Sequence, residues 1–237
     1  MATRPVFIPD VNGDVGVKEK LMDFEWFPGL AVVQKQKSIE SLHGAAINAG
    51  ISRLLEISSK SEETLGVNLS AFNLQITTKR NKKVFTVETA FQGSKVFEQG
   101  GPFTDLLMGT SKEAKKDIRL KESGDLKEFE FFGSMFPLRP RTFFYDWLYI
   151  NALNQNEKYK DEVLSYRGFT DIEFNPKKSI NCQAYSVALF VSLERSGKLK
   201  AALKTPEMFL DAVENAYNKK ERQQTESGSQ AVQGTLV

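Results

Sequence analysis

A single cysteine, Cys182, and a single histidine, His43, limit the ways in which this chain can be stabilised. One cysteine cannot form an intrachain disulfide, and the two residues cannot supply the Cys and His ligands of a structural zinc site. The fold must therefore rest on a hydrophobic core. With 237 residues, of which 41% are hydrophobic, the chain can bury such a core within one domain.

Charge and hydropathy exclude two further classes of protein. The 32 Lys and Arg residues nearly balance the 30 Asp and Glu residues, so no overall field favours non-specific binding of nucleic acid, and any DNA contact must be local. The start, MATRPVFIPD, lacks the features of a signal peptide, and the longest apolar run, residues 185–193, is too short to cross a bilayer. We therefore expect a cytoplasmic protein without membrane contact.

The apolar periodicity predicts an α+β domain, mainly helical, with a small antiparallel sheet. Helices are expected over residues 38–49, with Ser38 as the cap, and over 86–97, 110–120, 140–153, 157–166, 183–194 and 206–218. Extended segments are expected over 24–33 with a bend at Pro28, over a 73–87 hairpin with a basic tip at 79–83, and over 170–174.

One segment carries the clearest chemical pattern. On a helix, Glu88, Gln92 and Lys95 are spaced by four and three residues, so they would lie on one face. A solvated ion-pair stripe has the same spacing and contributes only about 0.3 to 0.5 kcal/mol. The neighbouring Gly93 and Ser94 are poor helix formers that could let a ligand approach closely. The spacing alone leaves both interpretations open.

Three segments resemble motifs of the NADAR (NAD and ADP-ribose) superfamily. VETAFQGSKVF carries the glutamate and lysine of the first motif. SKEAKKDIRL resembles a Ser-Pro-x-Glu-Ala-x-x-x-Gly-Arg element, but the proline after Ser111 is absent and Ile118 replaces the glycine. FTDIEFNPKKSINCQAYSVALFVSLERSG resembles the C-terminal motif, with Asp171 and Asn181 at its aspartate and asparagine positions but without its glycines.

The stretch from about Val67 to Arg195 is also similar to NADAR antitoxins paired with DarT-type guanine ADP-ribosyltransferase toxins. YDWLYINALNQN and DIEFNPKKSINCQAYS carry most of this similarity. The resemblance implies one NADAR domain, in which residues 1–66 add N-terminal strands and a helix and residues 67–220 form the catalytic region. The polar tail, 221–237, is expected to be disordered.

The implied activity is removal of ADP-ribose from guanine in DNA, which reverses a DarT-type toxin and needs no metal or other cofactor. In this reaction Lys95 would be a Schiff-base nucleophile, Glu88 a proton shuttle, and Asp171 the residue that orients the ribose or activates water. The residues expected to bind the ligand are Gln92, Lys115, Arg119, Asp146 and Asn181. ADP-ribosylated DNA is the expected partner, and direct binding of the cognate toxin stays open.

Two alternatives remain at this stage. N-glycosidases of riboflavin-pathway intermediates belong to the same superfamily, but their characteristic tryptophan would fall near residues 141–143, and Trp147 cannot be assumed to replace it. The chain could instead be a binding module that recognises ADP-ribose or the toxin without catalysis. Release of product from a defined substrate separates this last alternative from both enzymatic ones.

Overall fold

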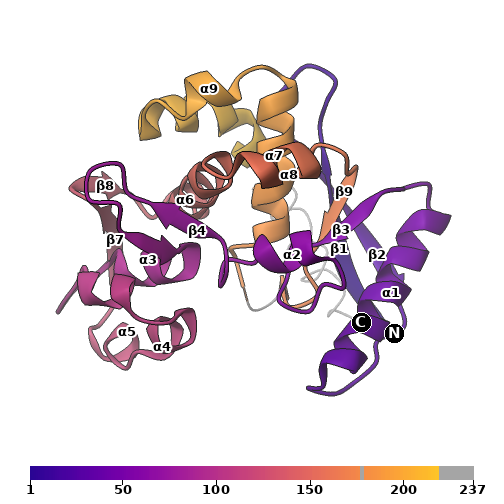
Figure 1. Cartoon of the computed structure of the whole chain (residues 1–237), viewed down its shortest axis with the longest axis horizontal. Helices are drawn as coiled ribbons and strands as arrows, with labels where there is room; N and C mark the ends of the chain where they lie inside the picture. Colours follow the sequence, from indigo (N-terminus) through magenta and orange to yellow (C-terminus); the bar gives the residue numbers. More distant parts are fainter. Residues whose placement is uncertain (177–178, 219–237) are drawn as a thin grey trace, which may run out of the picture.

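The computed structural model describes residues 1–176 and 179–218, in which helices and short strands follow one another along the chain (Figure 1). The strands are β1 (Ala2–Pro9), β2 (Val17–Phe24), β3 (Leu54–Glu56), β4 (Gln75–Thr77), β5 (Val84–Thr86), β6 (Lys95–Phe97), β7 (Leu126–Phe131), β8 (Ser134–Phe136) and β9 (Gly168–Thr170). The helices are α1 (Val32–Asn48), α2 (Thr64–Asn68), α3 (Val87–Gly93), the 3-10 helix η1 (Thr104–Met108), α4 (Ser111–Lys116), α5 (Arg119–Glu122), α6 (Phe143–Asn154), α7 (Glu157–Val163), α8 (Gln183–Arg195), α9 (Leu199–Ala202) and residues 206–218.

The largest sheet joins the two halves of the chain. Its strand order is β2-β1-β9-β3, with β1 and β2 paired antiparallel along their whole length. Strand β9 is antiparallel to β1 and parallel to β3. The remaining sheets, β4-β5 and β6-β7-β8, are antiparallel. The α+β class is thereby confirmed, with one parallel pair of strands among antiparallel ones.

Helix α8 lies at the centre of the molecule (Figure 1). Every residue from Ala184 to Leu193 is buried. The helix packs against β1 and β9 on one side and against α6 on another, and α3 packs in turn on α6. A helix that is apolar on all faces is stable in this position because other elements cover it completely. None of the described helices is long and apolar enough to cross a membrane.

A buried carboxylate ties α6 to α8 and to the last helix. Asp146 is 1% exposed, and its Oδ1 accepts a hydrogen bond from Ser186 Oγ at 2.6 Å. Its Oδ2 accepts one from the hydroxyl of Tyr217 at 3.1 Å. A buried carboxyl group is costly unless it is hydrogen-bonded, so we expected Asp146 to have hydrogen-bond partners if it were buried. These bonds supply partners and make Asp146 a structural link between three helices.

Several predicted elements are confirmed. The β4-β5 hairpin has its basic tip where the sequence indicated it, and α6, α7, α8 and the helix over 206–218 lie within three residues of their expected positions. N-terminal strands were expected within residues 1–66, but the hairpin of β1 and β2 was not located by the sequence. The tail, 221–237, lies outside the described residues.

The prediction for the start of the first helix was wrong. Helix α1 begins at Val32, so the segment 24–33 is not a pair of extended pieces, and Ser38 lies inside the helix. The Ser38 hydroxyl donates to the carbonyl of Gln34 at 3.0 Å and accepts from the backbone N–H of Phe27 at 3.0 Å. Ser38 therefore anchors the preceding loop instead of capping the helix.

The helix predicted over 86–97 is also shorter than expected. It ends at Gly93, and Lys95–Phe97 form β6, in which Lys95 lies opposite Phe129 of β7. Gly93 and Ser94 weaken the helix locally. The competing strand pairing is formed with residues far along the chain, which helical periodicity cannot reveal.

Two further boundaries differ from the prediction. Thr110 caps a helix, as expected, but the helix predicted over 110–120 divides at Asp117 into α4 and α5, because Asp117 has an extended ψ of 129°. The extended segment predicted at 170–174 lies earlier, since β9 ends at Thr170 and a turn follows. This turn brings Asp171 to the end of a buried strand.

Removal of the Ser186 hydroxyl should destabilise the protein measurably. In Ser186→Ala, Asp146 would lose a buried hydrogen bond, which costs about 1 to 3 kcal/mol, so we expect Tm to fall by roughly 3 to 10 °C. Ser134→Ala, at an exposed position, is the control and should leave Tm unchanged. Equal Tm values for the two variants in thermal denaturation would contradict the structural role of Asp146.

Candidate active site

A cavity of about 420 Å³ opens between α3 and the loops around the large sheet. Its volume falls within the range of small-molecule sites, about 300 to 1,000 Å³. Its walls come from the segments 58–60, 70–72, 171–174 and 179–183, from three residues of α3, and from one residue each of α4 and α6. Elements from both halves of the chain therefore build the cavity, and each contributes polar side chains.

Helix α3 supplies one wall. Its N-terminus is fixed by a capping box, in which Thr86 and Thr89 exchange hydrogen bonds, and every residue of the helix is buried. Glu88 and Gln92, 6% and 7% exposed, line the cavity. The alternative of a solvated surface stripe is therefore wrong for these two residues. Instead, they are partly desolvated groups that face a ligand-sized space.

Three side chains on this wall form a continuous hydrogen-bonded chain. Gln92 Nε2 donates to Glu88 Oε1 at 2.9 Å, and Lys95 Nζ donates to Gln92 Oε1 at 2.6 Å. Lys95 makes this contact from the first residue of β6, so the loss of helical geometry after Gly93 does not separate it from Gln92. Lys95 does not itself line the cavity. Its amine reaches the cavity wall through Gln92.

The surroundings of Lys95 lower the pKa of its amine. Burial lowers the pKa of Lys95, and the positive charge of Lys115 lowers it further, while Glu88 acts in the opposite direction. Lys95 Nζ lies 5.0 Å from the ring centroid of Phe91, a cation–π contact that acts in the same direction as Glu88. A lysine with a lowered pKa holds a larger fraction of nucleophilic amine at neutral pH.

Helix α4 adds a cation to the same wall. Lys115 lines the cavity, with its amine 5.1 Å from the ring centroid of Phe72. Ser111, the first residue of α4, donates to the carbonyl of Phe72 at 2.9 Å and is 2.8 Å from the hydroxyl of Thr86. These contacts fix α4 against the start of α3. Lys115 is thus held beside the cavity by a short, anchored helix.

The opposite wall carries a buried acid. Asp171 follows β9 directly, and its Oδ1 accepts from the backbone N–H groups of Glu173 and Phe174 at 3.0 and 3.2 Å. Burial is the main cause that raises the pKa of Asp171 well above its usual range, and the negative charge of Glu56 raises it further. The environment therefore favours the protonated carboxyl, which can donate a proton.

Sequence reasoning did not identify Glu56, a buried acid whose negative charge raises the pKa of Asp171. Glu56 is 2% exposed, and its two oxygens accept from Thr170 Oγ1 at 2.6 Å and from the N–H of Ile172 at 2.8 Å. Burial also raises the pKa of Glu56. The available signal was an acidic residue at the end of the apolar strand β3, Leu54–Glu56, where a charged group needs partners.

His43 belongs to the same buried hydrogen-bonded group as Glu56 and Thr170, but it does not line the cavity. Its Nε2 lies 2.8 Å from Thr170 Oγ1. The Thr170 hydroxyl donates its proton to Glu56, so it must accept from His43, which places the histidine proton on Nε2. Burial lowers the pKa of His43 to about 4, so the ring is neutral at pH 7. His43 is a structural anchor between α1 and β9.

Two amide side chains, Asn181 and Gln183, lie at the N-terminal end of α8. Gln183 accepts from the N–H of Ala71 at 2.8 Å and hydrogen-bonds Asp171, so it links the two walls. Asn181 lines the cavity, and its Oδ1 is buried without a hydrogen-bond partner among the described residues. A buried acceptor without a partner is rare in native proteins and is suited to a ligand donor.

The structure thus brings Glu88, Gln92, Lys115, Asp171 and Asn181 together around one cavity, with Lys95 one hydrogen bond behind. Arg119 and Asp146 are elsewhere. The Arg119 guanidinium pairs with Asp105 at 2.7 Å and with Asp117 at 2.9 Å. Asp146 is enclosed between helices. Their roles as ligand-binding residues stay predictions. Within 1–176 and 179–218, no group of three or more metal-ligating side chains is assembled.

The comparisons with known proteins agree with the motifs. The model of the family described as DarT1-associated NADAR antitoxin matches residues 2–223. A search of curated proteins finds no significant match. The family match extends over nearly the whole chain, and it includes the N-terminal hairpin and all of the cavity walls. The chain belongs to the family of DarT1-associated NADAR antitoxins.

Proposed function

We propose that this antitoxin hydrolyses the N-glycosidic bond between ADP-ribose and guanine in DNA and so reverses modification by a DarT1 toxin. The observation that carries the proposal is the cavity itself, because Glu88, Gln92 and Asp171 line the same ligand-sized space and Lys95 is hydrogen-bonded to Gln92. Cleavage at an anomeric carbon needs such a pair of groups, one that stabilises the sugar cation and one that protonates the leaving base.

Asp171 is assigned the role of the acid. Burial raises the pKa of Asp171, which favours the protonated carboxyl that can give its proton to the leaving guanine. This role replaces the activation of water that the motif alone suggested. Glu88, the carboxyl group on the α3 wall, stabilises the positive charge that develops on the ribose.

Lys95 acts in one of two ways that experiment can distinguish. If Gln92 releases the amine, Lys95 attacks C1 of the ribose as guanine departs with the proton from Asp171. Ring opening, with one amine proton passing to the ring oxygen, then yields a protonated Schiff base. Water hydrolyses it to free ADP-ribose and the amine, and the proton released returns to Asp171. If Gln92 retains the amine, Lys95 only orients Gln92 and Glu88 through the 2.6 Å and 2.9 Å hydrogen bonds.

Further residues support binding of the ADP-ribose. Lys115 and Lys60 line the cavity and can pair with the pyrophosphate, and Asn181 Oδ1 can accept from a ribose hydroxyl. Trp147 does not line the cavity. It packs with its ring centroid 5.0 Å from that of Phe136, so it offers no support for the alternative of a riboflavin-intermediate N-glycosidase.

The decisive experiment uses an oligonucleotide with one ADP-ribosylated guanine, incubated with the purified chain. Mass spectrometry and chromatography would follow free ADP-ribose and the restored DNA. Release of both products supports the proposed function. Tight retention of the modified DNA without release would instead assign the chain to the class of binding modules.

Glu88→Gln should abolish most of the activity without loss of fold. The substitution keeps the size of the side chain but removes the charge that stabilises the ribose cation, so we expect kcat to fall by about 10² to 10⁴-fold. Glu40→Gln, on the exposed face of α1, is the matched control. Activity of Glu88→Gln within threefold of the control would remove Glu88 from the mechanism.

Borohydride trapping tests the nucleophilic role of Lys95. If a Schiff base forms, reduction during turnover should add one ADP-ribosyl unit to the wild-type protein, mapped to Lys95, and Lys95→Met should show no adduct. The rate should rise with pH as Lys95 loses its proton. Because burial lowers the pKa of Lys95, the midpoint of this rise should lie below the ordinary lysine pKa of about 10.4. An active wild type without any adduct would leave Lys95 as an orienting residue.

The pH dependence tests Asp171 and Glu56 together. An acid must be protonated, so the rate should decline as pH rises through the raised pKa of Asp171. In Glu56→Gln the neighbouring negative charge is absent, so the pKa of Asp171 should fall and the declining limb of kcat should shift to lower pH. A limb that does not move in a folded Glu56→Gln variant would contradict the assignment of Asp171 as the acid.

A further inference from the structure

A second hollow lies outside the candidate active site, beside the tip of the β4-β5 hairpin. We call it the tip groove. It encloses about 490 Å³ and is lined by Thr77, Thr78, Lys79, Arg80, Asn81 and Lys83 of the hairpin, together with Phe131, Phe132, Ile76 and Gln155. None of these residues lines the cavity of the candidate active site. The groove therefore needs an explanation of its own.

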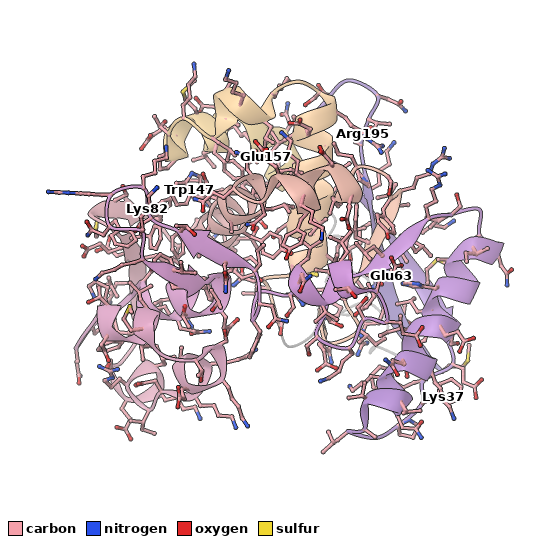
Figure 2. All side chains as sticks on the ribbon, viewed as in Figure 1. Lys37, Glu63, Lys82, Trp147, Glu157 and Arg195 are labelled. Atoms are coloured by element: carbon pink, nitrogen blue, oxygen red, sulfur yellow. The ribbon has the colours of Figure 1, made fainter. Side chains whose placement is uncertain are left out.

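The hairpin side of the groove is strongly basic. Lys79, Arg80, Lys82 and Lys83 are all exposed, and none of the four forms an ion pair with another described residue. Figure 2 shows Lys82 at the outer edge of the molecule, at the left of the view. Four adjacent cations without acidic partners form a local positive field in a chain whose net charge is only +2.

The hairpin is held in place. The N–H of Thr78 donates to the carbonyl of Lys83 at 2.9 Å, and the N–H of Lys83 donates to the Thr78 hydroxyl at 3.0 Å. The N–H of Thr77 donates to Gln155 Oε1 of the segment after α6 at 2.9 Å. The cations therefore project from a turn that is anchored to the helical body.

The other side of the groove presents an aromatic ring to solvent. Phe132 is 65% exposed and lies in the β7-β8 turn with a positive φ of 49°, followed by Gly133 at 82°. A bulky residue with positive φ is an outlier, because this conformation suits Gly and Asn. The Phe132 ring packs on Phe131 at 4.7 Å and on Phe85 at 6.0 Å, which fixes its direction.

We propose that the tip groove binds single-stranded DNA that flanks the modified guanine. Proteins bind single strands by combining cations along the backbone with aromatic faces on which bases stack, and the tip groove has both. The proposal rests on the proposed function for the identity of the strand.

The groove lies within reach of the active-site cavity. Phe72 lines the cavity and Thr77 lines the groove, and five residues of chain join them through β4. An extended chain of that length spans at most about 18 Å. At the 3.4 Å rise of one DNA strand, this distance is about five nucleotides. A strand of 12 nucleotides is therefore longer than this separation.

Fluorescence anisotropy with an unmodified 12-nucleotide single strand tests the charges. We expect the triple variant Lys79→Gln, Arg80→Gln and Lys83→Gln to bind at least tenfold more weakly. The slope of log K against log salt should fall by about 2, from three lost phosphate contacts at about 0.7 each. The matched control carries Lys198→Gln, Lys200→Gln and Lys204→Gln, which remove three exposed cations at residues 198–204. This control should bind within twofold of the wild type.

Phe132→Asn tests the ring without loss of fold. Asn tolerates the positive φ of this position, so Tm should stay equal or rise, while DNA affinity should fall at least fivefold. Met135→Ala, at a neighbouring exposed residue, should change affinity less than twofold. A stable Phe132→Asn variant with wild-type affinity would overturn the stacking role and the proposal with it.

The two proposals can fail separately. Binding of unmodified DNA does not depend on hydrolysis, so a chain that binds through the tip groove but releases no ADP-ribose would contradict only the proposed function. Equal affinity of the triple variant and its control, or equal affinity of a matched duplex, would overturn the tip groove as a single-strand site. Loss of toxin capture with unchanged DNA binding in the same variants would assign the groove to a protein partner.

Discussion

The complete burial of α8 is the constraint on which the rest of the structure depends. A helix with ten consecutive buried residues cannot exist without neighbours on every side, and β1, β9 and α6 provide them. Its N-terminal residue, Gln183, reaches the cavity and joins Asp171 to the backbone of Ala71. The helix that holds the core together therefore also sets the separation of the two cavity walls.

The cavity combines two groups that burial disposes toward their neutral forms. Burial lowers the pKa of Lys95 on the α3 wall and raises the pKa of Asp171 on the opposite wall. An enzyme that cleaves a bond to a poor leaving group at neutral pH needs such a pairing of proton donor and electron-pair donor. Glu56 strengthens the effect at Asp171, while its hydrogen bonds to Thr170 and Ile172 keep its own buried carboxyl group satisfied.

The sequence predicted the longer helices in the second half of the chain better than the strands. Strong apolar periodicity indicated α8 correctly, and motif order placed Glu88, Gln92 and Asp171 in one site. Strand β6 was missed because its stability comes from pairing with β7, about thirty residues away, and not from local pattern. Spacing also could not show that the Arg119 guanidinium forms ion pairs with Asp105 and Asp117, because ion pairing depends on the three-dimensional arrangement.

The position of β9 has a consequence for the order in which the protein can form during synthesis. Residues 168–170 insert between β1 and β3, which are made more than a hundred residues earlier. Until β9 leaves the ribosome, the edges of β1 and β3 have no partner, and the turn with Asp171 does not exist. The part of the cavity that carries Asp171 can therefore form only after most of the chain has been translated.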